Sequence, residues 1–249
     1  MVDESVKNLY ICGCSFLTDN KNISKTNAGK ELAKRLGLRP LEYAAGGRGN
    51  DRIIAATKQF FYLNSHIKHE TFALIGWSSS LRKDCLVKRK NATRLYDDNK
   101  YWKTLRYTDM SRLAIQEYRN LSRMDVANTL RLHHIMNILN LQDFFKVNGI
   151  KYCMYDALDN QWKGKGQWRN HFESEIDKSR FFGFNTLSHF DFVNKKGNEH
   201  VPEQYRDTSL NCDGLKKPKA SYKDEHPNSL GHSLWADKLQ NFIKENNLL

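Results

Sequence analysis

Proline is scarce in this sequence, with four residues in 249, and no long apolar run is present. There is also no internal repeat, no low-complexity stretch and no long linker of proline and glycine, which favours a single domain over residues 1–249. The first residues lack the basic region and apolar segment of a signal peptide, and no run is long enough to span a membrane. We therefore expect a soluble chain that is cytoplasmic when it is synthesised.

The five cysteines are irregularly spaced and form no Cys-x-x-Cys pair. This pattern disfavours a zinc ribbon or a thioredoxin-type site, and we expect no metal site. Cys12, Cys14 and Cys153 lie in apolar runs and are expected to be small core residues. Such cysteine usage suits a reducing compartment.

The charge of the chain is strongly unbalanced, with a formal net charge of +12 at pH 7. A segment at about residues 78–108 has weak periodicity, and between residues 78 and 106 it carries nine cations against three anions. We interpret it as a basic insertion, in which four aromatic residues lie among the cations: Tyr96, Tyr101, Trp102 and Tyr107. This mixture suits contact with a polyanion, with sugar faces or with stacked bases. The alternative is a solvated charged loop.

Short apolar runs alternate with helical patterns along the chain. This alternation predicts a parallel sheet covered by helices on both faces, a three-layer α/β/α domain with the first strand between the second and the third. Residues 156–222 are mixed in character and are expected to include short helices. The expected strands are 8–12, 41–45, 71–77 and 150–155, and the expected helical segments are 27–36, 51–64, 109–147 and 228–246.

Four short motifs lie next to these expected elements. They are GCSF at 13–16, GGRGN at 46–50 and GWS at 76–78, each at the end of a strand, and DEHPN at 224–228, before the last helix. Because the carboxyl ends of parallel strands share one edge of a sheet, the first three motifs are expected to meet there. The fourth can reach the same edge if the last helix packs antiparallel to the strands.

The residue types in these motifs are those of nucleophilic acyl transfer. Ser15 is a candidate nucleophile and His226 a candidate general base, since a serine hydroxyl needs a base to take its proton. Asp224 is the nearby acid that could orient the histidine. The Ser15 N–H, the Gly47 N–H and the Ser78 hydroxyl are candidate donors to the oxyanion of the tetrahedral intermediate.

These blocks resemble those of the SGNH (GDSL-like) hydrolases, and the likeness runs from one end of the chain to the other. ICGCSF resembles the family's Gly-x-Ser block, AAGGRGNDRI the block of the oxyanion glycine, and DEHPNSLGHSLWADKL the block of the histidine. The resemblance implies a flavodoxin-like sheet of order 2-1-3-4-5 and the hydrolysis of acyl esters without a cofactor. Within this family, the sequence is most similar to short members from tailed phages and environmental bacteria.

The sequence departs from the family pattern at two positions. Ser78 stands where the family has asparagine, which shortens the side chain and leaves one donor. Lys223 stands where the family has its aspartate, and Asp224 is displaced by one residue, so that either the loop adjusts or a Ser–His dyad operates. Four residues in or near these motifs are candidate substrate contacts: Arg48, Asn50, Trp77 and Arg82.

Three classes of function remain open from the sequence. The first is an esterase that acts on acyl esters, acetyl esters foremost, of a carbohydrate or a small molecule. The second is a structural or adaptor protein of the same fold, such as a virion component or a homo-oligomer, that binds glycans or a protein. The third is a nucleic-acid binder that uses the basic insertion, although no helix-turn-helix, zinc-finger or RNP motif supports it.

Overall fold

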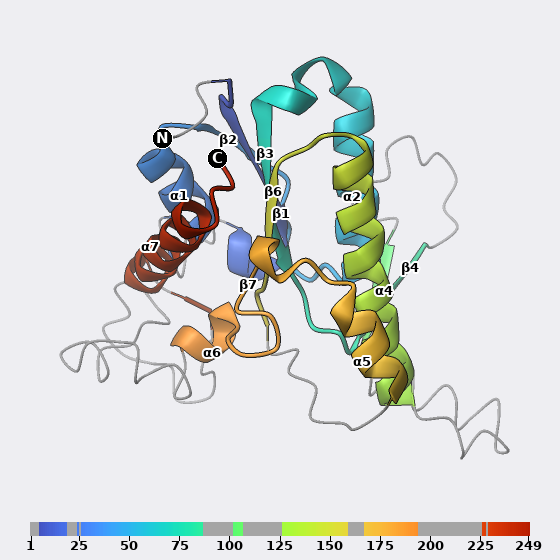
Figure 1. Ribbon diagram of the computed structural model, residues 1–249. Helices are drawn as coiled ribbons and strands as arrows, with labels where there is room; N and C mark the ends of the chain where they lie inside the picture. The colour runs from blue at the N-terminus through green and yellow to red at the C-terminus, as the bar shows by residue number, and fades with distance from the viewer. Residues whose placement is uncertain are drawn as a thin grey trace, which may run out of the picture.

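We analysed a computed structural model of the chain, which describes residues 5–18, 24, 26–86, 102–106, 126–158, 167–193, 226–227 and 229–249. Five parallel strands form the central sheet in the order β2-β1-β3-β6-β7. Counted along this sheet alone, the order is 2-1-3-4-5, and the prediction of an α/β domain with a flavodoxin-like sheet is confirmed (Figure 1). The strands are β1 (Asn8–Gly13), β2 (Arg39–Glu42), β3 (Thr71–Trp77), β6 (Tyr152–Asp156) and β7 (Phe181–Phe182).

Helices cover both faces of this sheet. On one face α1 packs against α7, and their apolar residues join one core cluster with the sheet. On the other face α2 and α4 form a second cluster around Ile53, Phe60 and Phe145 (Figure 1). The helices are α1 (Ala28–Leu36), α2 (Asn50–Leu63), α4 (Val126–Val147), α5 (Gln167–Ser174), α6 (His189–Val193) and α7 (Ser229–Glu245), with 3-10 turns η1 (Ser15–Leu17), η2 (Ser65–Glu70) and η3 (Lys178–Arg180).

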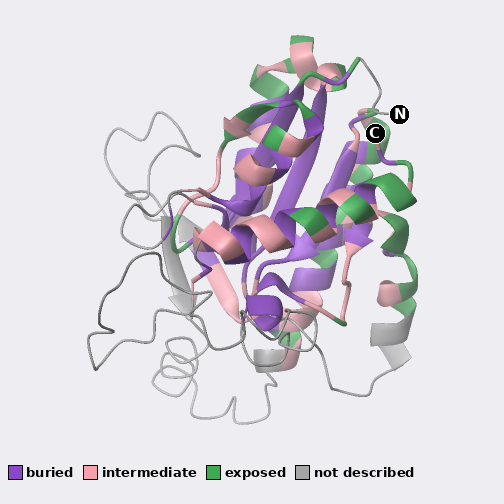
Figure 2. Ribbon diagram, turned by 90° about the vertical axis from the view of Figure 1, so that its left-hand side faces the viewer, coloured by how far each residue is buried: buried purple, intermediate pink, exposed green. Residues whose placement is uncertain are grey.

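The three inner strands are mostly apolar because helices cover both of their faces. Every residue of β1, β3 and β6 is buried, and the strands are seen as the purple centre of Figure 2. β2 lies at the edge and is mostly exposed, which accommodates Pro40, a residue that cannot donate to a second neighbour.

Two strands differ from the sequence-based expectation. The second strand was expected at 41–45 but runs from Arg39 to Glu42, and beyond it the N–H groups of Tyr43 and Ala45 still bond to β1 carbonyls. The fifth strand, β7, has two residues and lies in the segment for which only short helices were expected. Of the expected helical segment 109–147, residues 109–125 lie outside the described part, and the remainder is α4.

The expected insertion after β3 contains a separate antiparallel hairpin of β4 (Arg82–Leu86) and β5 (Trp102–Arg106). Its base is bound to the N-terminus of α2. The buried Asp84 carboxylate accepts hydrogen bonds from the N–H groups of Gly49, at 3.2 Å, and Arg52, at 3.1 Å. The N-cap residue Gly49 has no side chain to do this, so Asp84 caps the helix from outside and its charge faces the positive end of the helix dipole.

Within the described residues, no helix combines the length and the apolar character needed to cross a membrane.

Because Asp84 caps α2 from outside the helix, replacing Asp84 with alanine should loosen the start of α2. Two buried backbone N–H groups would lose a charged acceptor, and we expect the free energy of unfolding to fall by about 1–3 kcal/mol. Urea denaturation measures this change. As a control, Asp237→Ala removes a half-exposed partner of Arg35, 2.9 Å away, and should cost less than about 1 kcal/mol. Equal losses in the two variants would contradict the capping role of Asp84.

Candidate active site

Ser15 lies at the carboxyl end of the central strand β1. The chain leaves the strand through Cys14 and enters the short turn η1 at Ser15, where the Leu17 N–H bonds to the Cys14 carbonyl at 3.0 Å. The Thr18 hydroxyl donates to the Ser15 carbonyl, also at 3.0 Å, and holds the turn from its far side. Because the first N–H groups of a helical turn have no partner within it, the Ser15 amide is placed to donate outside the turn.

The structure brings His226 to Ser15 although 211 positions separate them in sequence. His226 Nε2 lies 2.7 Å from Ser15 Oγ, a short hydrogen-bond distance. The histidine directly precedes Pro227 and the start of α7, and its ring packs 5.0 Å from that of Phe16, centroid to centroid. The pair proposed from the sequence as nucleophile and base is thus within reach for proton transfer. Asp224, the predicted orienting acid, lies outside the described residues.

The thiol of Cys14 is a second nucleophilic group at this edge. It is completely buried, and burial raises its pKa above the usual range for cysteine. The thiolate is the nucleophilic form of cysteine. Cys14 therefore stays protonated and acts as a small core residue, as its apolar surroundings predicted.

Gly47 lies in the loop between β2 and α2 with a φ of 72°, a left-handed conformation that glycine adopts without a steric penalty. The neighbouring Arg48 is buried beneath the loop, and its guanidinium donates to the Tyr43 carbonyl and contacts the Cys12 sulfur at 3.8 Å. Arg48 therefore supports the loop from below.

Asn50 joins this loop to the end of β3. Its Oδ1 accepts the Ser78 N–H at 2.8 Å, and its Nδ2 donates to the Ser78 carbonyl at 3.2 Å. The side chain of Ser78 is itself buried, and Arg82 Nη1 donates to its hydroxyl oxygen at 3.2 Å. Trp77 is also buried, and its ring forms a T-shaped pair with that of His134, with a centroid distance of 5.7 Å. Among the four predicted substrate contacts, Arg82 is the partly exposed one.

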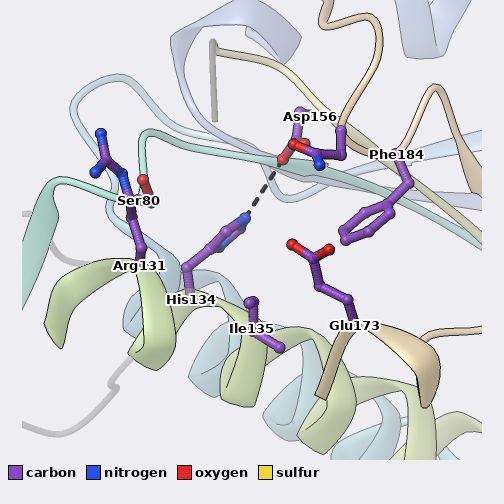
Figure 3. Close-up of a pocket in the computed structure, with 8 residues that line it drawn as sticks. Ser80, Arg131, His134, Ile135, Asp156, Glu173 and Phe184 are labelled. Atoms are coloured by element: carbon purple, nitrogen blue, oxygen red, sulfur yellow. Dashed lines mark ion pairs between the residues drawn. The ribbon is translucent and has the colours of Figure 1, made fainter. Parts of the chain in front are cut away.

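Sequence reasoning missed a polar pair on the other side of Asn50. His134 is buried, and its Nε2 lies 3.4 Å from the Asp156 carboxylate at the end of β6 (Figure 3). Its Nδ1 lies 3.0 Å from Asn50 Nδ2. A helical pattern in the sequence predicts which residues of α4 share a face. It does not predict that His134 contacts Asn50 and Asp156, which are 84 and 22 positions away.

A small pocket of about 20 Å³, with room for about one water molecule, adjoins this pair. In Figure 3 the His134 ring points toward Asp156, while Glu173 and Phe184 close the side opposite Arg131. Asn185, in the left-handed conformation with a φ of 56°, also lines it. The pocket lies at the carboxyl ends of β3 and β6, the same edge of the sheet as Ser15.

A buried histidine, His189, packs behind the candidate base. It stacks on Trp235 with a centroid distance of 4.8 Å and meets the edges of Phe16 and His232. Neither ring nitrogen has a hydrogen-bond partner among the described residues. Burial, followed by the nearby His232 and His226, holds the pKa of His189 well below its ordinary value of 6.5. His189 is therefore neutral in the folded protein.

This burial predicts a loss of stability in acid. Below pH 6.5 the unfolded chain binds a proton at His189 that the folded chain does not, so the free energy of unfolding falls as pH decreases, by at most about 1.4 kcal/mol per pH unit. His189→Phe keeps an aromatic ring on Trp235 and should remove this component. Urea denaturation at pH 7 and pH 5 should show a smaller drop for His189→Phe than for wild type, and an unchanged drop for His66→Phe at an exposed site. Equal drops in all three proteins would show that His189 is not the group responsible.

No group of three or more metal-binding side chains is found in the described ranges. Neither a family model nor a curated protein matches this sequence.

Proposed function

We propose that this protein is a serine esterase of the SGNH type that hydrolyses acyl esters, acetyl esters foremost, of a carbohydrate or a small molecule. The observation that carries the proposal is the 2.7 Å contact between Ser15 Oγ and His226 Nε2. Two features support it: the contact lies at the carboxyl edge of a parallel sheet, where ligands of such folds bind, and it joins the two residues that the sequence motifs selected.

The reaction proceeds in two halves. In the first, His226 Nε2 takes the Ser15 proton while Oγ attacks the ester carbonyl carbon, and the resulting tetrahedral oxyanion collapses as the bond to the alcohol oxygen breaks. His226 returns the proton to the departing alcohol, leaving an acyl group on Ser15. In the second half, a water molecule loses a proton to His226 and attacks the acyl carbon. The carboxylic acid leaves, and Ser15 recovers its proton.

Three donors serve the oxyanion in this proposal: the N–H groups of Ser15 and Gly47 and the hydroxyl of Ser78. The Arg82 guanidinium donates to Ser78 Oγ, so the hydroxyl proton is directed elsewhere and the hydroxyl becomes a stronger donor. This arrangement offsets part of the loss that follows from serine in place of asparagine. Losing one oxyanion donor outright costs roughly 10²–10³ in rate.

Asp224 is the proposed acid that holds the His226 ring in the productive tautomer. Side chains at i and i+2 of an extended segment point the same way, which favours Asp224 over Glu225. The alternative is a Ser15–His226 dyad.

Contact of the basic insertion with a polyanionic part of the substrate also remains a proposal. Arg82 and Lys83 are already engaged within the domain, by Ser78 and by Asp51 at 3.1 Å. Most of the other cations, including Arg89 and Lys90, lie outside the described residues.

A second candidate function is an adaptor of the same fold, such as a virion component or a self-associating protein, that binds a glycan or a protein partner without turnover. The complete burial of the Ser78 side chain favours it, because an oxyanion donor has to reach the substrate.

Hydrolysis of p-nitrophenyl acetate separates the two candidates. We expect turnover by the wild type and a loss of at least about 10³-fold in kcat/KM for Ser15→Ala and for His226→Ala, since both belong to one proton-transfer unit. His66→Ala, at an exposed position before β3, should behave as the wild type. Equal inactivity of wild type, Ser15→Ala and His226→Ala on a panel of acetyl esters would favour the adaptor.

The same assay locates the acid. Asp224→Asn should keep the fold and lower kcat by roughly 10²- to 10⁴-fold, because the amide can hold the wrong tautomer. Glu225→Gln is the matched control and should have little effect. Normal turnover by Asp224→Asn beside an inactive His226→Ala would establish a dyad or another acid.

A further inference from the structure

We propose that His134, held by Asp156, is a positioning residue that fixes the oxyanion loops through Asn50. The inference rests on the proposed function, because it assigns Gly47 and Ser78 to the oxyanion hole. It concerns side chains that belong to none of the sequence motifs: His134 on α4 and Asp156 at the end of β6.

Asn50 joins the two loops of the proposed oxyanion hole. As the first residue of α2, it directly follows the loop that holds Gly47. Its amide binds both the N–H and the carbonyl of Ser78, at 2.8 and 3.2 Å, so one side chain fixes the relative position of the two oxyanion loops. Asn50 and Ser78 are buried, and water does not replace these bonds cheaply.

His134 holds the side-chain amide of Asn50. Since its Oδ1 accepts the Ser78 N–H, its Nδ2 is the atom that faces His134, at 3.0 Å. A donor facing His134 Nδ1 requires that nitrogen to be an acceptor, which places the proton of the neutral ring on Nε2. The proton on Nε2 then faces the negative charge of Asp156, whose Oδ1 lies 3.4 Å from Nε2. The carboxylate selects the tautomer, and the tautomer orients the amide.

His134 and Asp156 act at a distance from the reacting serine. In the strand register, Gly13 lies beside Gly76 and Trp77 beside Asp156. Asp156 therefore lies two strands from the chain that carries Ser15, roughly 10 Å across the sheet. At that separation the pair acts on the reaction only through the groups it positions.

Two substitutions of His134 separate positioning from packing. The oxygen of an asparagine side chain can occupy the place of Nδ1 and accept the Asn50 amide, whereas a glutamine reaches the place of Nε2 and leaves Asn50 without its acceptor. We expect His134→Gln to lower kcat on p-nitrophenyl acetate by roughly ten- to hundredfold, with KM changed less than about twofold. His134→Asn should retain kcat within about threefold of wild type. Packing alone predicts the opposite order, because asparagine leaves the larger cavity.

A second measurement does not depend on turnover. The Ser78 amide proton is bonded to Asn50, so its rate of hydrogen exchange reports how firmly Asn50 holds the Ser78 backbone. We call this contact the clamp on Ser78. His134→Gln should speed this exchange at least about tenfold, and His134→Asn should not. Equal exchange in the two variants, or a kcat order that follows side-chain size, would overturn the inference. If the wild type hydrolyses no ester while exchange follows the expected order, the proposed function fails and the clamp on Ser78 stands.

Discussion

The parallel pairing of β1 with β3 brings Ser15 and Ser78 to the same edge of the sheet. The two strands are paired from Asn8 beside Thr71 to Gly13 beside Gly76. A Cβ at Gly13 would lie 2.6 Å from the Gly76 carbonyl oxygen, so the close approach at the end of the pair requires glycine. Ser15 and Ser78 each follow their glycine by two residues and leave the sheet side by side. The nucleophile and a candidate oxyanion donor are thus brought together by the register of two buried strands.

Around this pair, buried polar side chains hold loops that apolar packing alone would not fix. Asp84 caps α2 from the hairpin, Arg48 supports the loop from below, and Asn50 binds the backbone of Ser78. Burying such groups is costly unless each has its partners, and once they are satisfied they define one geometry. A catalytic constellation needs this kind of support, because small displacements of a donor lower the rate steeply.

The sequence predicted the parts of the structure that depend on local pattern. The inner strands are continuous apolar runs, and the motif containing Ser15 follows one of them, so both the α/β class and the position of this serine could be inferred. β2 was placed about two residues too late because an edge strand containing Arg39, Pro40 and Glu42 lacks the apolar pattern of a buried one. The two-residue β7 is too short to leave a pattern. The bonds of Asn50, His134 and Asp156 are long-range and arise only when three elements pack together.

The central claim is that Ser15 is a nucleophile activated by His226. Reaction of the whole protein with a fluorophosphonate probe, followed by mass spectrometry of its peptides, tests this claim without knowledge of the natural substrate, since phosphonylation requires the activated hydroxyl. We expect a single adduct on the peptide that contains Ser15, formed by the wild type and abolished in His226→Ala. The absence of an adduct on Ser15, or equal labelling of wild type and His226→Ala, would contradict the account.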